Sequence, residues 1–110
     1  MDDGERRPFD LDLGDGHTLW FFMWAPNRAL NPQYAGMPDV EKAGCTIAHS
    51  KPNGEPCEGA LTFDLPETRH LASDGHRWKV ESWEPLTLSP SVLCYCGDHG
   101  FVRGGKWVRA

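Results

Sequence analysis

Long apolar runs are absent from this sequence. The longest, TLWFFMWA at residues 18–25, falls far short of the roughly 20 residues that a transmembrane helix needs, and its length suits a β-strand. The first residues show no signal-peptide pattern, so we expect a cytoplasmic protein and no membrane partner. A surplus of positive charge is also absent, because the net charge is −5 and a general nucleic-acid binder usually carries the opposite sign.

Motifs of familiar enzyme classes are absent as well. The chain has neither the HExxH of metalloproteases, nor the HxE and PCxxC of zinc deaminases, nor the GxSxG of serine hydrolases. Glu55, Glu58 and Asp98 lie near potential metal ligands and could act as bases, but acidic residues beside turns are usually just solvated. We therefore expect a protein that is not an enzyme, with a zinc-dependent hydrolase as the alternative.

Glycine, proline and large aromatic rings are plentiful. The 110 residues include 12 glycines, nine prolines, five tryptophans and five phenylalanines. A chain of this length suits one domain with a modest core. The turn residues predict many short elements, and the rings predict a core or an interface built on large side chains.

Apolar and polar residues alternate in several short segments, as expected of half-buried strands. Glycine-containing turns separate these segments and predict hairpins. The predicted elements are a hairpin over residues 8–26, a hairpin from Cys45 to Asp64, a strand over 77–84, an extended segment over 86–94 broken at Pro90, and a hairpin over 100–110. Residues 25–44 predict a long loop with one helical turn near 38–42, and residues 64–72 predict a short helix.

Soft metal ligands crowd near the C-terminus. Cys94, Cys96 and His99 lie within the segment CYCGDHG. Zinc takes four nitrogen or sulfur ligands, commonly two from each of two short loops, and the spacing of Cys96 and His99 lets both converge across one tight turn. The alternative is disulfide bonding, but no secretion signal supports it, and Cys94 and Cys96 are too close for an easy bridge.

A second pair of ligands flanks the Asn-Gly turn of the 45–64 hairpin. His49 ends its first strand and Cys57 begins the second, so the two lie near each other. We predict a structural Zn²⁺ held by His49, Cys57, Cys96 and His99. Cys94 stays an open alternative, because it could replace Cys96 or His49 or line the site beside them. The other candidates are expected to have no ligand role: a small buried hydrophobe at Cys45 and solvated turn residues at His17, His70 and His76.

Together these features predict the fold class. We expect a mostly β protein, a small single domain over residues 1–110, built from hairpins and short sheets that a zinc-ribbon-like site clips together, with one or two short helical turns. The 45–64 hairpin is expected to pack against the strands between residues 78 and 107.

The stretch LSPSVLCYCGDHGFVRGGKWV resembles a domain family of unknown function found in bacteria and especially in actinobacterial phages. Members show a Pro-Ser-hydrophobic stretch, matched here by residues 90–92, then a Cys-x-x-His-aromatic-hydrophobic segment, matched by residues 96–102, and a glycine-containing hairpin. Many members hold two residues between the paired cysteines, where this chain has only Tyr95. The resemblance implies a compact metal-binding domain of phage origin and implies no activity.

The protein's partner is expected to be another protein, from the host or the virion. Four tryptophans at positions 20, 24, 83 and 107 exceed what so small a core needs, so they form either an exposed patch or a ring-filled core. A phage protein of this kind would lie in the cytoplasm of the infected cell or in the virion. Arg103, Lys106 and Arg109 make the C-terminal tail locally basic, which leaves a nucleic-acid-associated regulator as an alternative.

Overall fold

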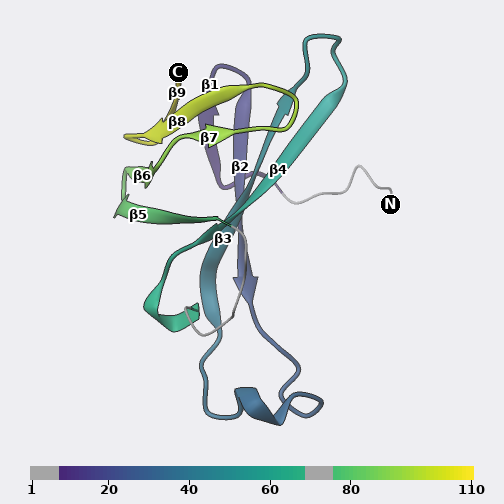
Figure 1. Ribbon diagram of the computed structural model, residues 1–110, viewed down its shortest axis with the longest axis vertical. Coiled ribbons are helices and arrows are strands. Elements are labelled where there is room, and N and C mark those ends of the chain that lie inside the picture. The colour runs from purple at the N-terminus through teal and green to yellow at the C-terminus, as the bar shows by residue number, and fades with distance from the viewer. Residues whose placement is uncertain (1–7, 69–75) are drawn as a thin grey trace.

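A computed structural model describes residues 8–68 and 76–110 as a small, mostly β domain (Figure 1). Strands account for 55% of the described residues and helical turns for 6%. The helical turns are two short 3₁₀ segments, η1 (Pro32–Tyr34) and η2 (Pro66–Thr68). The predicted fold class, a small β-rich domain with one or two helical turns, is confirmed.

The strands form two sheets. A six-stranded sheet runs in the order β1-β2-β3-β4-β5-β6, and a three-stranded sheet runs in the order β7-β8-β9. All neighbouring strands are antiparallel except the pair β4 and β5. The strands are β1 (Leu11–Gly14), β2 (His17–Trp24), β3 (Val40–Ser50), β4 (Pro56–Phe63), β5 (Arg77–Trp83), β6 (Leu86–Ser89), β7 (Val92–Leu93), β8 (His99–Arg103) and β9 (Lys106–Arg109).

The hairpins form where turn residues interrupt the alternating pattern. The β1–β2 turn holds Gly14, Asp15 and Gly16 in the left-handed region, with φ values of 80°, 54° and 77°. Glycine adopts this conformation without strain, and aspartate tolerates it better than most residues. The predicted hairpins over 8–26, 45–64 and 100–110 are all present.

The helical turn predicted near residues 38–42 is wrong. β3 already begins at Val40, which pairs with Trp24 of β2. Val40 and Ala43 are buried, so pairing with β2 and burial of these side chains outweigh the local helix signals of Pro38 and Gly44. β2 and β3 form a long central pair, and the loop between them lies at the bottom of Figure 1.

The helix predicted over residues 64–72 is reduced to η2, which spans only Pro66–Thr68. Its expected second half, with His70, lies outside the described residues. His76 is exposed, as predicted.

The core lies between the inner faces of the two sheets. The β3–β4 hairpin contributes Ile47, Leu61 and Phe63, and these pack against apolar residues of β6 to β9, as predicted. The further buried members of this cluster are Leu13, Leu19, Cys45, Leu86, Leu88, Val92, Val102 and Trp107.

The tryptophans divide between core and surface. Trp107 is buried in the core cluster, whereas the side chain of Trp83 is 40% exposed. Trp20 and Trp24 are half-buried. Trp107 therefore fits the alternative of a ring-filled core. Trp83, in contrast, packs one side of its ring against Phe21 and Phe63.

Candidate metal centre

The β3–β4 hairpin places His49 and Cys57 side by side. The two residues are register partners next to the turn, so their side chains leave the same face of the sheet. The turn is closed by backbone hydrogen bonds from Lys51 N–H to Glu55 O and from Gly54 N–H to Lys51 O, both 2.8 Å long. Both ligand side chains are shielded, since the His49 side chain is 7% exposed and Cys57 is 3% exposed.

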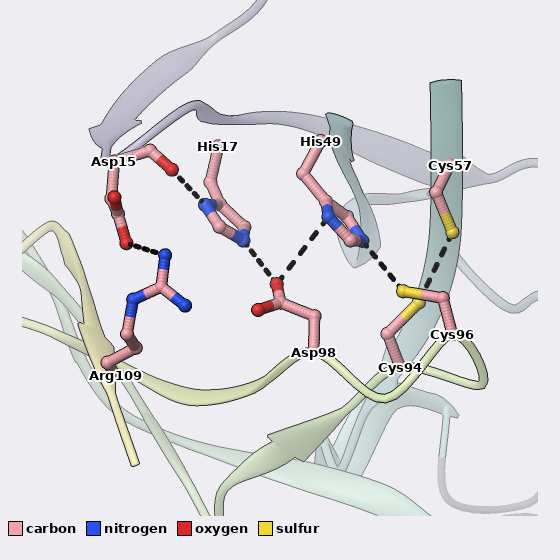
Figure 2. A network of polar contacts seen from close by, with 8 residues as sticks. All are labelled: Asp15, His17, His49, Cys57, Cys94, Cys96, Asp98 and Arg109. Atoms are coloured by element: carbon pink, nitrogen blue, oxygen red, sulfur yellow. Dashed lines mark hydrogen bonds and ion pairs between the residues drawn. The ribbon is translucent and has the colours of Figure 1, made fainter. Parts of the chain in front are cut away.

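The connection between β7 and β8 places Cys94 and Cys96 beside this hairpin. Cys94 N–H donates to Asp98 O, and Gly97 N–H donates to Cys94 O, each at 2.8 Å. Gly97 has a φ of 100°, which only glycine adopts easily. The tight turn therefore directs both sulfurs at His49 and Cys57, as Figure 2 shows.

The four side chains fit a tetrahedral metal site. One ligand atom from each of His49, Cys57, Cys94 and Cys96 lies within 4.8 Å of every other. The sulfurs of Cys57 and Cys94 are 3.5 Å apart, and Cys96 Sγ is 3.6 Å from His49 Nε2. Tetrahedral zinc with typical bond lengths separates two sulfur ligands by roughly 3.8 Å and a sulfur from a nitrogen by roughly 3.5 Å. A disulfide requires about 2.05 Å, so these are free thiols at ligand spacing.

Three of the four predicted ligands are brought together, and the fourth is not. His99 lies outside the cluster. Cys94 occupies the position of the fourth ligand, which the sequence analysis assigned to His99. His99 begins β8 on its exposed face, opposite Leu93, and its Nε2 is 2.9 Å from Ser91 Oγ. The Cys94–Asp98 hydrogen bond closes the turn one residue before His99, so strand alternation turns the imidazole away from the sulfurs.

A second layer of polar residues lies on the Nδ1 side of the His49 ring, away from the sulfurs. Its Nδ1 lies 3.5 Å from Asp98 Oδ2, the same oxygen that lies 2.5 Å from His17 Nε2. His17 Nδ1 in turn lies 2.7 Å from Asp15 O. A metal-bound histidine usually donates its other N–H to a carboxylate, which fixes its tautomer and orientation, and the Asp98 carboxylate lies on this side of the ring at ion-pair distance.

The placement of His17 corrects the prediction that it is a solvated turn residue. His17 is 3% exposed, and its ring stacks between Trp107, at a centroid distance of 4.2 Å, and His49, at 4.9 Å. Both of its nitrogens face acceptor oxygens, so the ring donates to both only when it carries two protons. Its contact with Asp98 spans 81 residues of sequence, and no local motif signals it.

The same network contains a second group of potential ligands, His17, His49 and Asp98. His49 belongs to both groups, and its Nε2 faces the sulfur of Cys96. At the end of the network, the Asp15 carboxylate pairs with Arg109 at 2.9 Å and so ties the β1–β2 turn to the end of β9. We therefore assign His17 and Asp98 a supporting role around the Cys₃His cluster.

The thiols of the chain differ in their acidity. Burial raises the pKa of Cys94 to about 11, whereas a hydrogen bond from the backbone N–H of Asp98 lowers the pKa of Cys96. Burial in the core raises the pKa of Cys45 to about 12. Cys45 lies outside both groups of potential ligands, in agreement with its predicted role as a small buried hydrophobe.

A pocket of about 490 Å³ opens beside the network and is lined in part by His17, Cys96 and Arg109. Of the three acidic residues considered as bases, only Asp98 lines this pocket, and its carboxylate already contacts the two histidines. Glu55 and Glu58 are exposed and belong to neither ligand group.

The fold and the site together define a small, β-rich protein with a Cys₃His cluster that could hold a metal ion. Comparison with protein-family models, curated proteins and solved structures finds no match to this chain. Within the described residues, no helix is both long enough and apolar enough to cross a membrane.

Proposed function

We propose that this is a small zinc-binding protein of phage type, in which the metal is structural, and that it acts by binding a host or virion protein. The donor set supports zinc, because three thiolates and one imidazole are a common structural zinc shell, whereas calcium and magnesium prefer oxygen ligands. His49, Cys57, Cys94 and Cys96 would hold the ion.

One observation carries the proposal: two distant segments supply two ligands each. The Cys57–Cys94 contact spans 37 residues and the His49–Cys96 contact spans 47. An ion at this point would clip the β3–β4 turn to the β7–β8 connection and hold the two sheets together. Metal-binding free energy is available only to the folded chain, so such a clip stabilises a small domain.

The number of protein donors supports a structural role for the metal. Catalytic zinc sites keep one coordination position for water or substrate, whereas structural sites are filled by four protein ligands. Here four donors gather within 4.8 Å of one another, and three of them are cysteines. A zinc-dependent hydrolase would need an open position, which this donor set does not offer.

A binding role is supported by the exposed apolar side chains around the cluster. Tyr95 lies between two of the cysteines and is 79% exposed, and Leu93 is 66% exposed. Tyrosine is a common anchor of protein interfaces, and an exposed leucine adds apolar area that a partner can cover. The resemblance to phage domains supports a partner in the virion or in the infected cell's cytoplasm.

The proposal is tested by metal analysis of protein purified without chelator. We expect one zinc ion per chain by elemental analysis. Replacement by Co²⁺ should give the visible absorption of tetrahedral cobalt with thiolate charge-transfer bands, which Cys94→Ser weakens and His99→Ala leaves unchanged. Protein without metal, or with Cys57 and Cys94 joined in a disulfide, would contradict the proposal.

A further inference from the structure

The outer face of the three-stranded sheet combines exposed apolar and basic side chains. Its buried face is formed by Val92, Gly100, Val102 and Trp107. Ladder pairing and strand alternation direct the remaining side chains of β7, β8 and β9 outward, except that of Arg109, which pairs with Gly100 and lies on the side of the buried face. This outer face consists of Leu93, His99, Phe101, Arg103, Lys106 and Val108.

The apolar part of the outer face is open to solvent. Leu93 is 66% exposed and Val108 is 39% exposed. Phe101 is half-buried and pairs with Val108 across the ladder, so the two side chains form a continuous apolar strip. Burying this strip against a partner would remove large apolar side chains from water.

The basic part of the outer face is available to a partner. Arg103 and Lys106 are opposite each other in the β8–β9 ladder. Neither forms an ion pair with a carboxylate of the described residues, in contrast to Arg28 and Arg109. The Arg103 guanidinium lies 4.0 Å from the centroid of the Phe101 ring, a cation–π contact that leaves its N–H groups to bind an anion.

A groove of about 630 Å³ continues from this face toward β6. Phe101 and Arg103 line one side, and Thr87, Pro90 and the carboxylate-bearing Glu81 contribute to the other, so the carboxylates of a bound segment would have to lie on the Arg103 side. The groove gives an extended segment a path along the junction of the two sheets. It therefore favours a partner in an extended conformation over a flat surface.

We infer that the outer face of β7, β8 and β9 binds an extended acidic segment of a partner protein. Apolar side chains of that segment would cover Leu93, Phe101 and Val108, while its carboxylates would bind Arg103 and Lys106. The charges match, because Arg103 and Lys106 are two cations that pair with no carboxylate of the described residues. The inference rests on the proposed protein-binding function and names its surface and its class of partner.

Single-stranded nucleic acid fits this face less well. Proteins that bind single-stranded nucleic acid usually stack successive bases on several aromatic rings. Here the face offers two rings, Phe101, which Arg103 already covers, and the imidazole of His99, and its apolar members besides Phe101 are the aliphatic Leu93 and Val108. An acidic peptide with leucine or phenylalanine side chains needs no such platform.

The experiment is an NMR titration of the zinc-loaded, ¹⁵N-labelled full chain. The probe is a short synthetic peptide that mixes aspartate and glutamate with leucine and phenylalanine. Its controls are the same peptide with lysine at each acidic position and an oligothymidylate of equal length. We expect the acidic peptide alone to shift the amide signals of β7, β8 and β9.

Two variants and a matched control test whether residues of the outer face contribute to peptide binding. Lys106→Glu and Phe101→Ala should each weaken binding of the acidic peptide about tenfold, the effect of losing a typical anchor contact. Lys42→Glu makes the same change of charge on β3 of the other sheet and should alter binding less than about twofold.

The inference is overturned if the acidic peptide shifts no signals on this face, if oligothymidylate binds there more tightly, or if Lys42→Glu weakens binding as much as Lys106→Glu. Elemental analysis of the same samples separates this result from the fate of the proposed metal. Stoichiometric zinc without peptide binding contradicts only the proposed peptide-binding face. Protein without zinc contradicts the proposed structural metal site.

Discussion

His49 links the two polar layers of the site because its ring nitrogens face different partners. Nε2 is 3.6 Å from the sulfur of Cys96, and Nδ1 is 3.5 Å from the carboxylate of Asp98. With Nε2 as a metal ligand, the proton stays on Nδ1 and points at Asp98. His17 holds that carboxylate from its other side, so the orientation of one ligand depends on a residue near the start of β2.

Asp98→Ala should weaken zinc binding by about tenfold to a hundredfold, since removal of the carboxylate behind a ligating histidine typically has this effect. The measurement is competition with a chromophoric chelator. Asp39→Ala is the matched control, because Asp39 is also ion-paired, with Arg28, but lies outside both ligand groups. Equal affinities in wild type and Asp98→Ala would show that the carboxylate does not support the site.

Cys94→Ser should lower stability far more than His99→Ala. Losing one of four ligands should remove a large share of the roughly 5–15 kcal/mol by which a domain is stable. His99→Ala removes one exposed hydrogen bond, to Ser91, and should cost at most about 1.5 kcal/mol. Thermal melts of both variants test this, with Cys96→Ser expected to match Cys94→Ser.

At the scale of elements, the position of the three-stranded sheet depends on close packing between β8 and β9. Gly100 lies directly beneath the ring of Trp107, and a Cβ added at Gly100 would lie 2.6 Å from two atoms of that ring. Trp107 in turn stacks on His17 at 4.2 Å. The absence of a side chain at Gly100 therefore allows the Trp107 indole to stack on His17, which contacts Asp98 beside the metal cluster.

Gly100→Ala should be destabilising by about 1–3 kcal/mol, the usual range for overpacking a core. Gly59→Ala on β4 is the matched control, because a Cβ there meets no atom within 4 Å and the backbone is unstrained. That control should be neutral or stabilising by up to about 1 kcal/mol. Urea denaturation measures both, and equal stabilities for the two variants would contradict the close packing of Trp107.

At the scale of the molecule, a metal clip would make folding depend on chelator and on pH. Its thiols must lose protons to bind the ion, and the pKa of Cys94 is raised to about 11 in the absence of metal. Binding therefore releases protons, so a lower pH should weaken it and a higher pH should strengthen it. The lowered pKa of Cys96 reduces the competition between protons and the metal ion at that sulfur.

Chelator should lower the melting temperature of the wild type and leave that of Cys94→Ser nearly unchanged, because the variant binds the ion too weakly to gain much stability from it. The apparent zinc affinity of the wild type should fall as the pH is lowered from about 8 to about 6. Melts with and without chelator and zinc competition at each pH measure these effects. Equal melting temperatures of the wild type with and without chelator would exclude a stabilising metal.

Local sequence determined most of the strands and three of the four residues of the cluster. Alternating side chains and glycine turns predict the three hairpins because both signals act between near neighbours. His49 and Cys57 were found for the same reason, since they flank one short turn. The prediction of a helical turn near residue 40 failed because Val40 pairs with Trp24 in a neighbouring strand, and helix signals between near neighbours do not report such a pairing.

The tertiary structure alone decided the fourth ligand and the supporting layer. Cys94 and His99 both lie within the CYCGDHG segment, and only the hydrogen bond that closes the turn at Asp98 determines which of them faces the hairpin. His17 looks like a solvated turn residue until the packing of β1 and β2 brings it to Asp98, 81 residues away. Residue spacing reports what can converge within one turn, whereas contacts across the sheets depend on how the whole core packs.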